Sequence, residues 1–181
     1  MARKPTTQQL ATWDRRYLWH PFTQMQEWER EDPVIIERGK GSYLIDTEGK
    51  KYLDGTSSIW VNLHGHRHPI LDRAIKRQLD KIAHSTFLGL SNPPAIELAR
   101  ELIRIAPKGL TRVFYSDNGS TAVEIALKMA VQYWQQRHPK AGPKNTFLHL
   151  QLAYHGDTIG AVSVGNIALF HSRFKPLLFP T

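Results

Sequence analysis

The sequence predicts an α/β protein in which a parallel sheet is covered by helices. Two β-prone segments, 112–115 and 146–153, are separated by a long helical pattern at 120–136. Each β-prone segment ends in a short polar turn that contains glycine, at Ser116–Ser120 and at Tyr154–Thr158. Strands joined through helices run parallel, and ligands bind beyond their carboxyl ends. Both turns are therefore expected at one edge of the sheet, where they would form a site.

Length and composition indicate a globular protein without a disulfide framework. The chain has 181 residues, 41% of them hydrophobic and 22% charged, and contains no cysteine. Lysine and arginine give a net charge of +8, but they alternate with acidic and apolar residues, which is typical of a solvated surface. No apolar run is long enough for a membrane span, and the basic N-terminus lacks the apolar core of a secretory signal. We expect a cytoplasmic protein that binds neither nucleic acid nor membranes.

The first third of the chain is predicted to form a short helix and a β-meander. Five aromatic residues before residue 31 suggest that this segment docks on a larger body. The helix is expected over Leu10–Trp19, because the pair His20-Pro21 stops it. Alternating apolar residues and glycine-containing turns then predict three strands, at Pro33–Arg38, Ser42–Asp46 and Lys51–Gly55.

Residues 56–69 differ from the meander because they combine hydroxyl residues, a tryptophan and three histidines. The alternation of His64, His66 and His68 is compatible with metal ligation from an extended strand. Glycine and proline within the segment indicate a turn instead, and no carboxylate or thiol is evident beside it. The segment is therefore predicted to be a loop that presents Trp60 and Asn62, and no metal site is predicted there.

The remaining elements follow from periodicity and from turn residues. Apolar residues at helical spacing predict amphipathic helices over Ile70–His84 and Pro93–Ile105. His138–Lys144 reads as a connecting loop. Ile159–Gly165 reads as a strand or loop of small residues, and the tail Phe170–Pro180 as irregular.

The segment Arg112–Gln136 carries the predicted site. Polar residues recur only every fourth position of its helix, so the helix is expected to be mostly buried. Ser120 or Thr121 is the predicted N-cap, and Thr121 with Glu124 forms a predicted capping box. A turn that leads into a helix N-terminus offers backbone amides to an anion such as phosphate. The absence of both nucleotide-binding glycine motifs favours a single compact phosphate, although a simple connection has the same features.

The second turn suggests what the phosphate would belong to. A phosphate on Gly119 and Ser120 beside Tyr154 and His155 suits a flat phosphorylated cofactor, with the phenol stacked on its ring. Pyridoxal 5'-phosphate fits, and it would also require a lysine and a carboxylate for its ring nitrogen. The residues alone leave a second interpretation open, in which Tyr154 and His155 are half-buried aromatic residues at a strand end.

Four segments resemble the class III pyridoxal-phosphate aminotransferases of fold type I. They lie in family order along nearly the whole chain: HPFTQM at 20–25, DGTSSIWVNLHGHRHP at 54–69, VFYSDNGSTAVEIALKMA at 113–130 and YHGDTIGAVSVG at 154–165. Within the family they are most similar to the subfamily that converts 8-amino-7-oxononanoate to 7,8-diaminononanoate in biotin synthesis. The alternatives are another class III ω-aminotransferase and a basic protein that binds nucleic acid or a protein partner.

The resemblance implies an organisation and a set of roles. Residues 1–69 would be an N-terminal segment with the substrate wall, and residues 70–181 the first part of the cofactor-binding domain. The implied cofactor-binding residues are Asn118, Gly119, Ser120, Tyr154 and His155. The implied substrate-binding residues are Phe22, Ile59, Trp60, Tyr154 and Asp157. Small-molecule partners would be an amino donor and a keto acid, and the complete enzyme would be a homodimer.

Two departures from the family pattern carry further expectations. Ile59 and Phe22 stand where members that use S-adenosylmethionine have tryptophan and tyrosine, which favours lysine as the amino donor. Lys128 is the one lysine that falls in the matching segments, and the resemblance implies that the family's catalytic lysine lies beyond the position that matches Thr181. The chain is therefore expected to be an N-terminal fragment that is inactive alone, because transamination requires that lysine.

Overall fold

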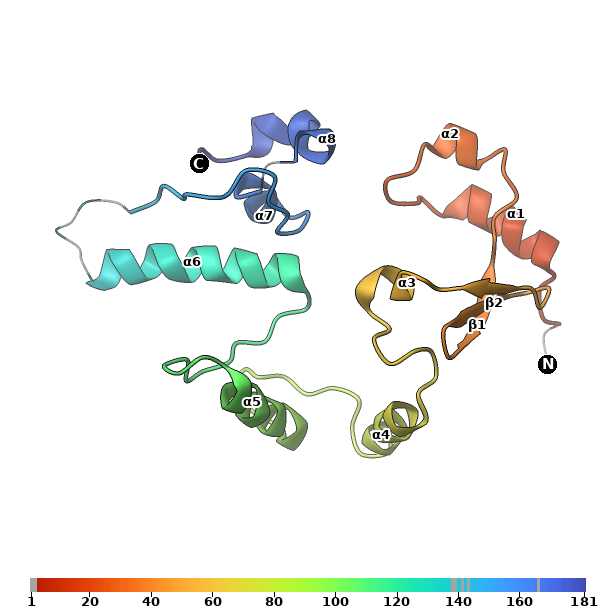
Figure 1. Ribbon diagram of the computed structural model, residues 1–181, viewed down its shortest axis with the longest axis horizontal. Coiled ribbons are helices and arrows are strands. Elements are labelled where there is room, and N and C mark those ends of the chain that lie inside the picture. The colour runs from red at the N-terminus through yellow and green to blue at the C-terminus, as the bar shows by residue number, and fades with distance from the viewer. Residues whose placement is uncertain (1–2, 138–139, 141, 143, 166) are drawn as a thin grey trace. The chain divides into compact units, whose positions relative to one another are not determined.

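The computed structural model describes residues 3–137, 140, 142, 144–165 and 167–181 of the protein. The chain forms two units, Met1–Leu90 and Ser91–Thr181, whose elements Figure 1 labels. The predicted loop His138–Lys144 lies mostly outside the described residues. Among the residues described, none of the helices combines the length and the hydropathy that crossing a bilayer requires.

The first helix of the first unit is α1, Thr7–Tyr17. It begins three residues earlier than predicted because Thr6 caps it: the Thr6 hydroxyl accepts from the Gln9 amide (3.2 Å), and the Gln9 side chain accepts from the Thr6 amide (2.9 Å). This reciprocal arrangement satisfies two amides of the first turn. The cap precedes the apolar residues from which the helix was predicted.

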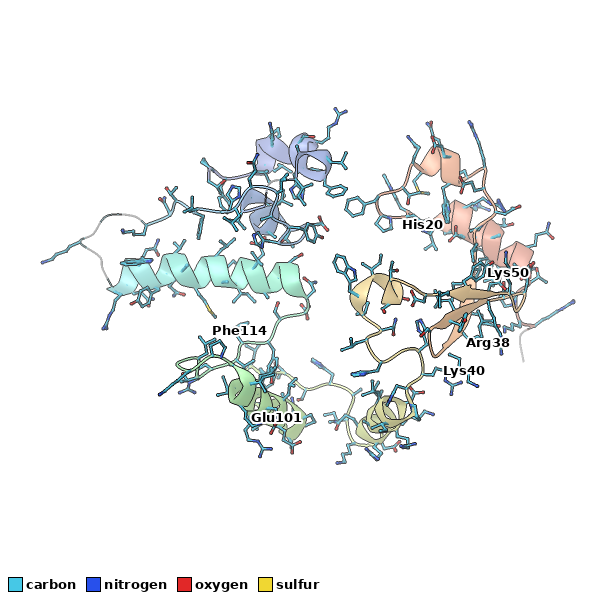
Figure 2. All side chains as sticks on the ribbon, in the orientation of Figure 1. His20, Arg38, Lys40, Lys50, Glu101 and Phe114 are labelled. Carbon is cyan, nitrogen blue, oxygen red and sulfur yellow. The ribbon has the colours of Figure 1, made fainter. Side chains whose placement is uncertain are left out.

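A short helix that the sequence did not predict, α2 at Met25–Trp28, is tied to α1 through Asp14. The Trp28 indole donates to one Asp14 oxygen (2.8 Å), and His20 Nε2 lies 3.1 Å from the other. The His20 ring, labelled in Figure 2, packs against Trp28 with 4.2 Å between centroids. The aromatic N-terminal segment is thus organised locally around one carboxylate.

The predicted meander is confirmed as an antiparallel sheet in the order β1-β2-β3. Its strands are β1 at Ile36–Lys40, β2 at Tyr43–Asp46 and β3 at Lys51–Leu53. The turn between β2 and β3 is closed by Asp46, which is almost fully buried. Its carboxylate accepts from the amides of Glu48 (3.0 Å) and Lys50 (2.9 Å) and from the Tyr52 hydroxyl (2.9 Å).

After the meander, the predicted loop contains a single helical turn, α3 at Ser57–Trp60, and α4 follows at Pro69–Leu79. The four residues of α3 all have positive φ, so the turn is left-handed. Helix α4 begins with Pro69 at its first position, which suits the fixed φ of proline. It ends five residues before the predicted end at His84.

The second unit contains α5, which spans the predicted range Pro93–Ile105, and α6, Gly119–Arg137. The region predicted as a strand or loop of small residues is instead the helix α7, Ile159–Ser163. The tail predicted as irregular forms α8, Ala168–His171, and a 3-10 helix, η1, Ser172–Leu177.

The predicted parallel sheet does not form within the described part of the chain. Residues 112–115 and 146–153 adopt no strand there, and the sheet that is present is the antiparallel meander. A strand requires a hydrogen-bonded neighbour, and neither segment has one among the described residues. Their apolar side chains are correspondingly exposed, as those of Phe114, Leu148 and Leu150 illustrate.

The core of the second unit is α7, not α6. Gly160–Ser163 are all buried, and α7 lies alongside the N-terminal half of α6 (Figure 1). The expectation that α6 is mostly buried is wrong for this structure, because none of its residues is fully buried. Small side chains let α7 approach a larger helix closely, and periodicity does not register that property.

The buried Asp46 gives the meander a predictable response to acid. Burial alone would raise the pKa of Asp46, but the donors from Tyr52, Lys50 and Glu48 outweigh it and lower the pKa below the ordinary value of 3.8. A carboxyl with a lowered pKa stabilises the fold above that value, and its contribution is lost as the pH falls through the folded-state pKa. We expect Tyr52→Phe to raise the Asp46 titration midpoint, measured by carbon NMR of the carboxyl group, and to weaken the acid dependence of unfolding. A midpoint unaffected by the substitution would contradict this account.

Candidate functional site

The first turn of α6 is capped by Asn118, two or three residues before the predicted caps. The Asn118 side-chain oxygen accepts from the Thr121 amide (3.0 Å), and the Thr121 hydroxyl accepts from the Asn118 amide (3.1 Å). The Ser116 hydroxyl also bonds to the Thr121 hydroxyl. The predicted N-caps and the predicted box of Thr121 with Glu124 are therefore wrong. Asparagine is as strong a cap as serine, so residue type did not distinguish them.

This cap leaves two donors at the start of α6. The amides of Gly119 and Ser120 make no hydrogen bond within the described part of the chain. They occupy the first two positions of a helix of 19 residues, where backbone amides have no intrahelical acceptor. The positive end of the helix dipole reinforces them, so this turn is suited to an anion.

The predicted turns at Ser116–Ser120 and Tyr154–Thr158 are brought together. The Asp157 amide donates to the Ser120 hydroxyl oxygen (3.2 Å), and the Tyr154 hydroxyl donates to Asp157 Oδ2 (2.7 Å). Since the Ser120 oxygen accepts this bond, its own proton remains available to a ligand. The hydrogen bond to Asp157 raises the pKa of Tyr154, so the phenol stays protonated at neutral pH.

The close approach of the two turns depends on Gly156. Its φ is +113°, and a Cβ there would overlap the Ser120 side chain and lie 2.9 Å from the Ser120 Cα. Gly160, one helical turn later, faces Glu124 in the same way, because a Cβ there would overlap the carboxylate. A pair of glycines four residues apart was the sequence signal for this packing, but periodicity alone did not reveal it.

Glu124 fastens the second turn to α6. Its carboxylate accepts from the amides of Gly160 (2.7 Å) and Ala161 (3.3 Å) at the start of α7. The pKa of Glu124 is lowered, first by the neighbouring Thr158 hydroxyl and then by the amides of Gly160 and Ala161. Burial acts in the opposite direction but is outweighed. Glu124 is thus an anion at neutral pH, and sequence reasoning missed this role by assigning it to a capping box.

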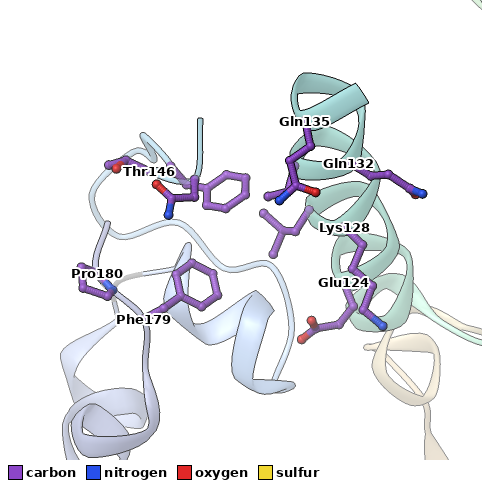
Figure 3. A pocket seen from close by; sticks show the side chains of 11 residues that line it. Glu124, Lys128, Gln132, Gln135, Thr146, Phe179 and Pro180 are labelled. Atoms are coloured by element: carbon purple, nitrogen blue, oxygen red, sulfur yellow. The ribbon is translucent and has the colours of Figure 1, made fainter. Parts of the chain in front are cut away.

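His155 lies apart from this contact. It lines a hollow of about 490 Å³ beside the apolar face of α6, together with Val123 and Leu127. A larger groove of about 730 Å³ runs along α6 between Lys128 and Gln135 on one side and Thr146 and Phe179 on the other (Figure 3). Of the predicted cofactor residues, Asn118, Gly119, Ser120 and Tyr154 therefore lie in the two turns that meet, whereas His155 lines the separate hollow.

The remaining predicted substrate residues belong to the first unit. Phe22, Ile59 and Trp60 are 80%, 71% and 81% exposed. All three have positive φ, which is uncommon for residues other than glycine. Nearby, His66 is paired with Asp54, which the sequence analysis had not associated with the histidines, and the rings of His64 and His68 lie 5.8 Å apart.

Comparison with protein families identifies residues 24–181 with the family described as aminotransferase class-III. A relative from Geobacter sulfurreducens, an adenosylmethionine-8-amino-7-oxononanoate aminotransferase, is 58% identical over 97% of this chain and 38% of its own length. A relative of the same name from Staphylococcus aureus is 60% identical over 96% of the chain and 38% of its own length. The chain thus spans less than two fifths of the length of these relatives.

Solved structures agree with the sequence relatives. The crystal structure of adenosylmethionine-8-amino-7-oxononanoate aminotransferase from Methanocaldococcus jannaschii matches with a TM-score of 0.92 and 54% identity, over 97% of this chain and 40% of that one. An ω-transaminase from Pseudomonas jessenii in complex with PMP matches with a TM-score of 0.84 and 31% identity, over 95% and 37%. The fold is therefore that of the fold type I transaminases. The chain belongs to the aminotransferase class-III family.

The contact between the two turns is testable by substitution of Gly156. Gly156→Ala adds a Cβ that overlaps Ser120 and strains a positive φ, so we expect the Asp157 amide to exchange with solvent roughly fivefold to tenfold faster once its hydrogen bond is lost. Residue-resolved hydrogen exchange measures this.

Gly109 provides the matched control. Its φ of +105° is similar, but a Cβ there meets no heavy atom within 4 Å. Gly109→Ala therefore introduces the backbone strain without the steric overlap and should leave exchange at Asp157 unchanged. Equal effects of the two substitutions at Asp157 would show that close packing at Gly156 does not hold the turn.

Proposed function

We propose that the protein to which this chain belongs transfers an amino group to 8-amino-7-oxononanoate, with pyridoxal 5'-phosphate as cofactor. The observation that carries the proposal is the hydrogen bond between the Asp157 amide and Ser120, which joins a phosphate-type helix N-terminus to an aromatic turn. The close relatives named as 8-amino-7-oxononanoate aminotransferases support it.

The residues present fit this cofactor. The unpaired amides of Gly119 and Ser120, together with the Ser120 hydroxyl, would hold the phosphate, and Asn118 would fix the turn that presents them. Tyr154 would cover the ring face, with its hydroxyl held by Asp157 so that the ring keeps one orientation. When bound, the cofactor supplies an electron sink for transamination. No lysine of this chain is assigned as the catalytic one.

The substrate side is proposed on the exposed aromatic and apolar residues of the first unit. Trp60, Ile59 and Phe22 present apolar surface to solvent, which suits contact with an apolar ligand. An indole suits the aliphatic chain of 8-amino-7-oxononanoate, and such apolar walls commonly fix substrate orientation. We further propose a homodimer for the complete enzyme, on the basis of the family resemblance.

The proposed phosphate role of Gly119 is tested by a matched pair of substitutions. Gly119→Pro removes the amide hydrogen at the first helical position, where proline is well tolerated, whereas Gly119→Ala keeps it. A Cβ at Gly119 meets nothing within 4 Å, so the alanine control creates no overlap with the rest of the described chain. We expect about tenfold weaker binding of pyridoxal 5'-phosphate for the proline variant alone.

This measurement is an absorbance or fluorescence titration with the longest reading frame that encodes the chain. Pyridoxal without phosphate is the control ligand, and its affinity should be the same for both variants. Equal affinity of both variants for the phosphorylated cofactor would refute the assignment of this turn to the phosphate.

The amino donor is a separate prediction. Ile59 and Phe22 favour lysine, whereas the relatives from Geobacter sulfurreducens and Staphylococcus aureus are named as adenosylmethionine-8-amino-7-oxononanoate aminotransferases. We propose lysine, and expect diaminononanoate to form with lysine and not with S-adenosylmethionine when each donor is offered separately to the longest reading frame that encodes the chain. Turnover with S-adenosylmethionine alone would reject the proposal, and failure with both donors would count against the aminotransferase assignment itself.

A further inference from the structure

The turn α3 has an unfavourable backbone. The φ values of Ser57, Ser58, Ile59 and Trp60 are 51°, 49°, 60° and 70°, so four consecutive residues with side chains lie in the left-handed region. Left-handed conformations are sterically poor for such residues and occur mostly singly. Ile59 is the extreme case because its side chain is β-branched. Such a turn persists only if its surroundings hold it.

Asp54 stabilises this turn through hydrogen bonds to Ser58. One carboxylate oxygen accepts from the Ser58 amide (2.7 Å) and the other from the Ser58 hydroxyl (2.8 Å). The side chain of Asp54 is only 5% exposed, so these are well-shielded, charge-assisted bonds. The Ser58 amide and hydroxyl lower the pKa of Asp54, burial opposes them and His66 adds to them, so the group is a carboxylate at neutral pH.

Asp54 is itself held by His66. The imidazole Nε2 donates to Asp54 Oδ2 (2.7 Å), and the side chain of His66 is 14% exposed. His66 is fixed in turn on the meander by two backbone bonds with Gly41, of 2.7 Å and 3.1 Å. Its ring lies so close to Gly39 that a Cβ there would be 2.6 Å from the ring carbon Cγ. A continuous path of contacts therefore runs from the sheet to α3.

Trp60 is the end of this path. Its indole is 81% exposed and has no hydrogen bond or ring contact within the described part of the chain. The backbone of α3 therefore sets the direction in which this side chain leaves the main chain, and packing adds nothing to it. A side chain that must present a surface to a ligand benefits from such fixation, because less freedom is lost on binding.

We propose that Asp54, Ser58 and His66 are positioning residues that hold α3 in its left-handed form and so fix Trp60 as the substrate wall. The part that concerns substrate rests on the proposed function. The part that concerns the Trp60 conformation rests on the contacts alone.

Three single substitutions separate this role from a general loss of stability. Ser58→Ala removes the hydroxyl that Asp54 holds and keeps the strain of a side chain at positive φ. Ser58→Gly removes the same hydroxyl but also removes the strain at position 58, since glycine adopts positive φ readily. Ser57→Ala is the control, because it deletes a hydroxyl of the same turn that makes no hydrogen bond among the described residues.

The readouts are the indole NMR resonance of Trp60 and the kinetics of the longest reading frame that encodes the chain. For Ser58→Ala we expect a shifted or broadened resonance and a KM for 8-amino-7-oxononanoate raised about tenfold with little change in kcat, because substrate is bound less well before and during reaction alike. For Ser58→Gly and for Ser57→Ala we expect a Trp60 resonance and a KM close to those of the parent protein. Cofactor affinity should be the same in all.

Each outcome decides one part of the proposal. If Ser58→Ala behaves as Ser57→Ala does, Ser58 does not position Trp60 and the proposal is overturned. If Ser58→Gly is impaired as strongly as Ser58→Ala, the hydroxyl does not act by holding a strained backbone. If the Trp60 resonance changes as expected in a protein without aminotransferase activity, the positioning role stands and the proposed function fails.

Discussion

The structure of the second unit depends on how closely the turn at Tyr154–Thr158 approaches the first turn of α6. Two glycines make the approach possible, since a side chain at Gly156 or Gly160 would occupy the space of Ser120 or Glu124. Two sets of hydrogen bonds then hold the turn against α6: the Asp157 amide donates to Ser120, and amides of α7 donate to Glu124. Without this contact the free amides of α6 would face solvent alone, and Tyr154 would have no defined position beside them.

Local signals made much of the fold predictable. The helix at Pro93–Ile105 was predicted to the residue, because apolar residues at helical spacing follow the pair Pro93-Pro94, which suits a helix start. The meander followed from alternation and from its turn glycines. By contrast, α7 was missed, because the buried helix of small residues Gly160–Ser163 has no amphipathic pattern. Its helical state comes from packing on α6 and from capping by Glu124, which are tertiary effects.

The predicted parallel sheet illustrates a different limit. Residues 112–115 and 146–153 have the composition of buried strands, but a strand is defined by a partner, and the described residues provide none. The composition of these segments is therefore compatible with buried strands, but strands do not form without a partner strand. The same distinction explains α6, whose apolar sides are as predicted although none of its residues is fully buried.

The sequence predicted that the two turns meet, but it did not predict the hydrogen bonds that join them. Asn118, Gly119, Ser120 and Tyr154 lie in these two turns, which meet because Gly156 lets the Asp157 amide reach the Ser120 hydroxyl. The sequence did not indicate which side chain makes which hydrogen bond. Asn118, and not Ser120 or Thr121, is the N-cap of α6, so the Ser120 hydroxyl can accept from the Asp157 amide. In each unit one anionic side chain fixes the decisive turn, Glu124 at α7 and Asp54 at α3, by accepting backbone amides. Because each such bond links residues of a single unit, the cradle around Ser120 and the presentation of Trp60 are each established locally. Substitutions in one unit should therefore leave the geometry of the other unchanged, which is the condition under which their separate effects on ligand binding add.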